Sequence, residues 1–200
     1  MWYLLDQAPN GFGSHFLEWL QGIENSLSVS FADWHPSDEE TQELERWIQQ
    51  TGQEVPTTLQ IYYRHAYPFD NVKNGALLWS DRVERYFKTW REQQRSASLP
   101  GGLEDLVSTA KLMLWPIDCF RHFDTVAFST AQGDLVVIHI DALSAKVTPV
   151  AVELRNYFLT QVGLQILAAE LNVQPDWDML CSDPRIASLS RWPTVGSSRQ

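Results

Sequence analysis

Residues 134–140 read Asp-Leu-Val-Val-Ile-His-Ile, and this segment constrains the fold more than any other in the chain. Successive side chains of a strand point to opposite faces of the sheet. One face of this strand therefore carries Val136, Ile138 and Ile140, and the other carries Leu135, Val137 and His139. Both faces begin apolar, which is typical of a central strand covered on both sides. We accordingly expect His139 to be a buried core or interface residue.

Neighbouring strands are predicted on both sides of this segment. Residues 125–129 form an apolar run that ends before a turn at 131–134, and residues 147–152 form another. The turn is short enough to join antiparallel strands directly. A further short strand is expected at residues 75–79.

Helix patterns dominate the rest of the sequence. Ser37 and Glu40 form a capping box, and Gly52 is placed to end the helix that they begin. Pro56 suits the first position of another helix. From apolar residues at helical spacing and from these start and stop residues, we expect helices near 12–27, 37–52, 56–67, 80–90 and 153–171.

The order of these elements favours an α+β fold, in which an antiparallel meander is flanked by N-terminal helices and a C-terminal helix. We expect a single domain over residues 1–175, with its core at about 33–171. Residues 176–200 mix Trp with Pro, Ser and Gly and are predicted to form an irregular tail.

The chain is acidic, with 25 acidic against 15 basic residues and a formal net charge of -10. This balance argues against nucleic acid and against an anionic membrane surface as partners. The negative charge then has two interpretations: it keeps the protein soluble, or it attracts a basic partner. No apolar run approaches the roughly 20 residues of a membrane helix, and residues 1–6 lack a secretory pattern. A cytoplasmic location is therefore expected.

No catalytic, metal-binding or cofactor-binding motif is evident. Cys119 and His122 lie three positions apart between two aspartates, but catalytic pairs are usually brought together by the fold and not by adjacency. A tetrahedral metal site would need further ligands. We expect no catalytic residue, no metal and no cofactor, and a protein that is not an enzyme.

The strongest candidate for a binding site is the acidic segment 33–54, which holds seven acidic residues against Arg46 alone, a net charge of -6. It is either a solvated helix face or a patch that steers a partner. Aromatic residues set among polar ones are candidate interface anchors. The candidate partner-binding residues are Trp34, Asp38, Glu39, Glu40, Glu43 and Trp192. The mildly basic stretch from Arg82 to Arg95 either pairs with the acidic helix of the same chain or faces an acidic patch on a second copy, so a homodimer stays open.

Several motifs follow one another in an order that resembles the SUKH superfamily. They are the capped acidic helix with Leu44-Glu45, the link from Gly52 to Val55-Pro56, a helix ending in Tyr62-Tyr63, Gly133-Asp134 before an apolar strand, and Tyr157-Phe158-Leu159 in the last helix. The resemblance covers about residues 33–171. The chain departs from the family after the second helix, where an Asn-Gly is usual and residues 65–68 read His-Ala-Tyr-Pro. The GAD-like immunity domain is a neighbouring possibility.

The resemblance implies a function. Bacterial SUKH proteins are largely immunity proteins that bind and neutralise a cognate toxin, often a nuclease or deaminase, in the cytoplasm of the producing cell. The resemblance implies a protein toxin as the partner, and the acidic charge of the chain favours a toxin with a basic surface. The alternative is a non-enzymatic regulatory or scaffold protein that binds a host enzyme. The gene next to this one would separate the two, because immunity genes accompany toxin genes.

Overall fold

The computed structural model confirms an α+β fold. It describes residues 1–32, 34, 38–39, 42, 45–46, 49, 54–66, 115–120, 123–129, 134–141, 147–175 and 182–191. By its internal contacts the chain divides into two compact units. Unit 1 comprises Met1–Phe69 and Ala151–Arg191, and unit 2 comprises Asp70–Val150 and Trp192–Gln200. One domain over residues 1–175 stays a prediction.

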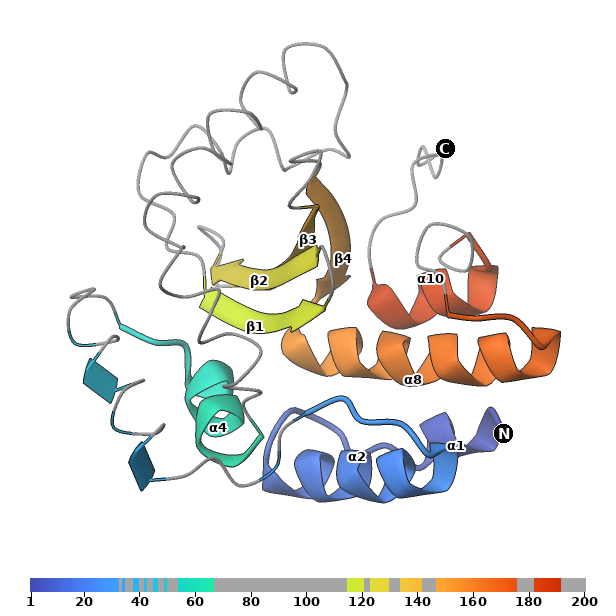
Figure 1. The fold of residues 1–200 in the computed structure, drawn as a ribbon, viewed down its shortest axis with the longest axis horizontal. Coiled ribbons are helices and arrows are strands. Elements are labelled where there is room, and N and C mark those ends of the chain that lie inside the picture. The colour runs from blue at the N-terminus through green and yellow to red at the C-terminus, as the bar shows by residue number, and fades with distance from the viewer. Residues whose placement is uncertain are drawn as a thin grey trace, which may run out of the picture. The chain divides into compact units, whose positions relative to one another are not determined.

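A four-stranded sheet is built from β1 (Trp115–Phe120), β2 (Phe123–Ser129), β3 (Leu135–Asp141) and β4 (Val147–Val152), in that order across the sheet (Figure 1). The pairs β1–β2 and β2–β3 are antiparallel, with Val126 opposite Ile138 in the second pair. The predicted strands at 125–129, 135–140 and 147–152 are thus confirmed.

Strand β3 lies between β2 and β4, and the described residues on both of its faces are buried, in agreement with its apolar pattern. Val136 and Ile138 are buried on one face, and Leu135, Val137 and His139 are buried on the other. Strand β1 was not predicted. Its Pro116 lacks an N–H group, and the register shifts between Pro116 and Asp118, so the side chains do not follow a simple alternation.

The helices of unit 1 are α1 (Tyr3–Asp6), α2 (Ser14–Leu27), α4 (Thr57–His65), α8 (Leu154–Leu171) and α10 (Pro184–Ser190). Helices α1, α2 and α10 each contact α8, and α2 also contacts α4. Helix α8 is buried along most of its length, as expected of a helix that is apolar nearly all round.

Aromatic rings join the helices of unit 1 around Phe158. Its ring centroid lies 6.2 Å from that of Phe12 and 5.5 Å from that of Tyr62, so α8 meets the segment before α2 and also α4. The Arg155 guanidinium lies 5.7 Å from the ring centroid of Phe16, and its Nε donates to the Pro9 carbonyl at 2.8 Å. Such aromatic pairs stabilise the packing by more than the burial of their apolar area alone.

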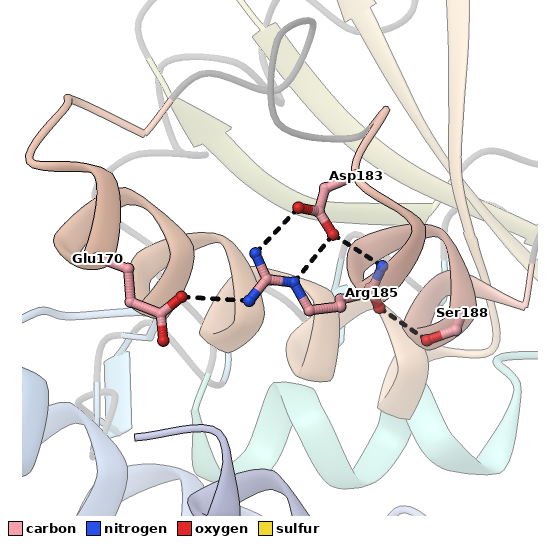
Figure 2. A network of polar contacts seen from close by, with 4 residues as sticks. All are labelled: Glu170, Asp183, Arg185 and Ser188. Atoms are coloured by element: carbon pink, nitrogen blue, oxygen red, sulfur yellow. Dashed lines mark hydrogen bonds and ion pairs between the residues drawn. The ribbon is translucent and has the colours of Figure 1, made fainter.

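Helix α10 corrects the prediction of an irregular tail. Asp183 caps this helix by accepting the Arg185 backbone N–H at 2.8 Å, and Pro184 opens it. The Arg185 side chain donates to both Asp183 oxygens and to Glu170 on α8 at 3.2 Å (Figure 2). Ile186 is buried against α8. The tail prediction overlooked the Asp-Pro pair, which is a helix-start pattern.

Of the other helix predictions, some are confirmed and some concern residues that the structure does not describe. Helices near 12–27, 56–67 and 153–171 are confirmed, although Pro56 is the N-cap and not the first helical residue. In the acidic segment, the described residues Asp38, Glu39, Gln42, Glu45, Arg46 and Gln49 are helical. The remaining predictions, including the capping box, the strand at 75–79 and the helix at 80–90, lie outside the described residues.

Candidate partner-binding site

Three of the six predicted partner-binding residues belong to the described part of the chain. Asp38 and Glu39 are helical and exposed, as a steering patch requires. Trp34 is partly buried and is held by a hydrogen bond from its indole Nε1 to Glu24. The side chains of Glu40, Glu43 and Trp192 lie outside the described residues.

Helix α2 ends so that the following chain folds back toward Glu24. Ser28 adopts a left-handed conformation with φ 53°, and the Val29 N–H donates to the Glu24 carbonyl at 3.1 Å. A left-handed residue at this position is a common way to end a helix. After this turn Phe31, Ala32 and Trp34 lie within hydrogen-bonding reach of Glu24, in the last turns of α2.

The Glu24 side chain then gathers three donors from this returning segment. Its Oε1 accepts the backbone N–H of Phe31 and, at 3.0 Å, that of Ala32. Its Oε2 accepts the Trp34 indole N–H. We call this arrangement of Glu24, Phe31, Ala32 and Trp34 the Glu24 clasp. Glu24 itself is only 6 % exposed, so the clasp is closed to solvent on the carboxylate side.

The electrostatics of the clasp are unusual because a buried charge is held by neutral donors. Within the described residues no basic side chain lies within ion-pair distance of Glu24. Burial raises the pKa of Glu24 above its usual 4.5, because it removes the hydration of the carboxylate, and the three hydrogen bonds oppose that rise. The hydrogen bonds therefore offset part of the cost of burying the charge.

Trp34 differs from two other tryptophans of unit 1. The indole N–H groups of Trp2 and Trp19 are buried, and neither has a hydrogen-bond partner among the described residues. The Trp34 N–H is instead paired with a carboxylate oxygen, which is a strong acceptor. The orientation of the Trp34 ring is thus set by a specific bond and not by packing alone.

Sequence reasoning did not single out Glu24. The residue lies four positions after Leu20 and so falls on the buried face of α2, where Phe16, Leu20 and Ile23 also lie. A carboxylate on the buried face of a helix needs hydrogen-bond donors from neighbouring segments, so its position in the pattern was the available signal. The donors come from Phe31, Ala32 and Trp34, whose approach depends on the turn at Ser28.

Two further described residues, Cys119 and His139, are of types that can carry chemistry. Cys119 lies opposite Asp124 in the β1–β2 pair, while His122 is outside the described residues. His139 is buried as predicted, and burial lowers its pKa from 6.5 to about 4, so it is neutral at physiological pH. In the described part of the chain, no three His, Cys, Asp or Glu residues are grouped as metal ligands.

No protein-family model, curated protein or solved structure matches this chain. The SUKH resemblance therefore stays an expectation drawn from its motifs. Within the described residues, no helix has both the length and the apolar character needed to cross a membrane.

Proposed function

We propose that this chain is a cytoplasmic immunity protein. It binds a cognate toxin through the toxin's basic surface and neutralises the toxin by keeping the toxin's target away from that surface. The observation that carries the proposal is the placement of a clasped, partly buried Trp34 just before a helical segment with exposed Asp38 and Glu39. Interfaces commonly combine an aromatic anchor with surrounding charges that guide the encounter. The motifs that resemble the SUKH superfamily point to the same role.

The charge distribution supports a basic partner. The net charge of the whole chain is -10, and the segment 33–54 contributes seven acidic residues. Glu45 is also helical and exposed, so the negative charge continues beyond Asp38 and Glu39. A field of this sign raises the association rate of a cationic protein, and salt screens it over a Debye length of about 8 Å at physiological strength.

The first test is biological. The protein encoded directly upstream of this chain's gene should be toxic when it is expressed alone in a sensitive bacterial host. Co-expression of this chain should restore growth, and the two purified proteins should form a complex. A neighbouring gene whose product is harmless, or a toxin that this chain does not bind, would contradict the proposal.

The second test separates a local patch from net charge. Asp38→Asn with Glu39→Gln should slow association with the toxin at least roughly threefold at low salt, and the difference should shrink as salt rises. The matched control is Asp6→Asn with Glu18→Gln, because both residues are exposed and the same two charges are removed. Equal slowing by both pairs would mean that net charge, and not the acidic helical segment, guides binding.

A further inference from the structure

One carboxylate controls the conformation of the segment that carries the candidate anchor. Glu24 belongs to α2, yet its two oxygens accept N–H groups of Phe31, Ala32 and Trp34, which lie seven, eight and ten positions further along the chain. Two of these bonds fix the backbone just before Trp34, and the third fixes the Trp34 ring. Backbone and side chain are thus set by the same group.

We propose that Glu24 is the positioning residue of the binding site, which holds the Trp34 ring in the orientation in which it meets the partner. The inference rests on the proposed function, because it assigns Trp34 the anchoring role. Its own content is that Glu24 acts through Trp34 and does not touch the partner. Glu24 is almost fully buried, which excludes it from direct contact.

The energetic reason is preorganisation. Immobilising a side chain at an interface costs free energy when it happens on binding, and that cost is removed if the side chain is already fixed. A tryptophan has only two side-chain torsions, so a single bond from its indole N–H is enough to select one orientation. The Glu24 clasp supplies this bond before any partner arrives.

The acceptor capacity of the clasp requires a carboxylate. Two oxygens with about four lone-pair sites can accept all three N–H groups. A glutamine at the same position has one acceptor oxygen and an NH₂ group that cannot accept. Glu24→Gln therefore keeps the shape of the side chain while it removes the acceptor for at least one donor. Among the described residues Oε2 accepts only the Trp34 indole N–H, so this bond is the one that the substitution removes when the Oε1 pair is kept.

The clasp also defines what the partner can offer to Trp34. The only hydrogen-bond donor of an indole is its N–H, and here that group is already used by Glu24. The partner must then contact the ring itself. We infer an apolar side chain, or the flat face of a cationic group, as the partner's contact with Trp34, and not a hydrogen-bond acceptor.

The first experiment needs no partner. In ¹⁵N-labelled protein, the indole N–H signal of Trp34 is identified among those of the nine tryptophans by its loss in Trp34→Phe. Its exchange with solvent should be slow in the wild type and at least roughly tenfold faster in Glu24→Gln, because the paired hydrogen becomes free. Glu18→Gln, an exposed glutamate on the same helix, is the control and should leave the rate unchanged. An unchanged rate in Glu24→Gln would overturn the positioning role.

The second experiment is a double-mutant cycle on binding of the toxin encoded upstream. Glu24→Gln should weaken affinity about tenfold, and it should have almost no further effect in a Trp34→Phe background, because Glu24 acts through the indole N–H. Equal weakening in both backgrounds would overturn the proposal, since Glu24 would then act by another route. Circular dichroism and the melting temperature confirm that each variant is folded.

Two outcomes keep the test decisive. If Glu24→Gln does not fold, Trp34→Phe carries the test, since it removes the indole N–H that Glu24 accepts together with part of the anchoring ring, and unchanged affinity in that variant overturns the proposal. If no toxin binds the chain, the proposed function fails, and the partner half of this inference fails with it. Unchanged indole exchange combined with normal toxin binding refutes the positioning role alone.

Discussion

Adding one methyl group at Gly163 tests how closely α10 is seated on α8. A Cβ at this position would lie 2.6 Å from Leu189 Cδ1 and 3.1 Å from Ile186 Cδ1, and 3.7 Å from the Trp2 ring. The first distance is a clash, and the second is tight. At Gly163, side chains from α10 and from Trp2 therefore lie close to the backbone of α8.

Two opposing terms set the expected magnitude. Replacing a glycine within a helix by alanine gains about 1 kcal/mol from helix propensity. Overpacking a close contact costs about 1–3 kcal/mol, and the lower part of that range applies because Leu189 Cδ1 ends a side chain that can rotate. We expect Gly163→Ala to be neutral or up to about 1 kcal/mol destabilising.

Gly22 provides the matched control. It lies within α2, and a Cβ there would meet nothing within 4 Å. Gly22→Ala should thus stabilise by about 1 kcal/mol, and the two variants should differ by about 1–2 kcal/mol in the free energy of unfolding measured in urea.

The cause of the difference can be isolated in a Leu189→Ala background. Without the Leu189 methyl groups the clash is removed, so Gly163→Ala should become stabilising there. The reasoning would be refuted if Gly163→Ala and Gly22→Ala changed the free energy of unfolding equally in the wild-type background. A difference that Leu189→Ala leaves unchanged would refute it as well.

Three further predictions concern the core and its charge. Burial lowers the pKa of His139 to about 4 from 6.5, so the unfolded chain takes up a proton below pH 6.5 while the folded chain resists it until about pH 4. Stability should therefore fall by about 3 kcal/mol between these pH values relative to His139→Gln, and parallel pH profiles of unfolding would contradict this. Ile138→Asp buries an unpaired charge in β3 and should cost several kcal/mol, about 3 or more, so near-wild-type thermal stability would rule out the assigned face. Ile186→Ala should cost about 2–4 kcal/mol in chemical unfolding because Ile186 is buried against α8, whereas the exposed Ser188→Ala should cost much less; similar losses would argue against the docking of α10.

The sequence predicted the elements whose pattern is long and regular. The alternation in 134–140 identified β3 as a central strand, and the apolar run after residue 153 identified α8. Strand β1 was missed because Pro116 and the register shift interrupt its alternation. Helix α10 was missed because its seven residues are too few for a helical period to be recognised.

The candidate site was predicted only in part, for a different physical reason. Exposure of Asp38 and Glu39 follows from their charge. The hold on Trp34 does not, because it depends on a carboxylate ten positions earlier and on a left-handed turn at Ser28 between them. Sequence patterns describe faces of elements, and they do not describe where a returning loop places its N–H groups.

The composition of unit 1 from two distant stretches has a consequence for synthesis on the ribosome. Phe12 and Phe16 belong to residues 1–69, but their partners Phe158 and Arg155 belong to residues 151–191. At about 5–20 residues per second, making residues 70–150 takes roughly 4–16 s, and during that time the aromatic face of α2 has no α8 to cover it. The nascent chain thus exposes these aromatic rings early and buries them late, so a chaperone that covers them would act during this interval.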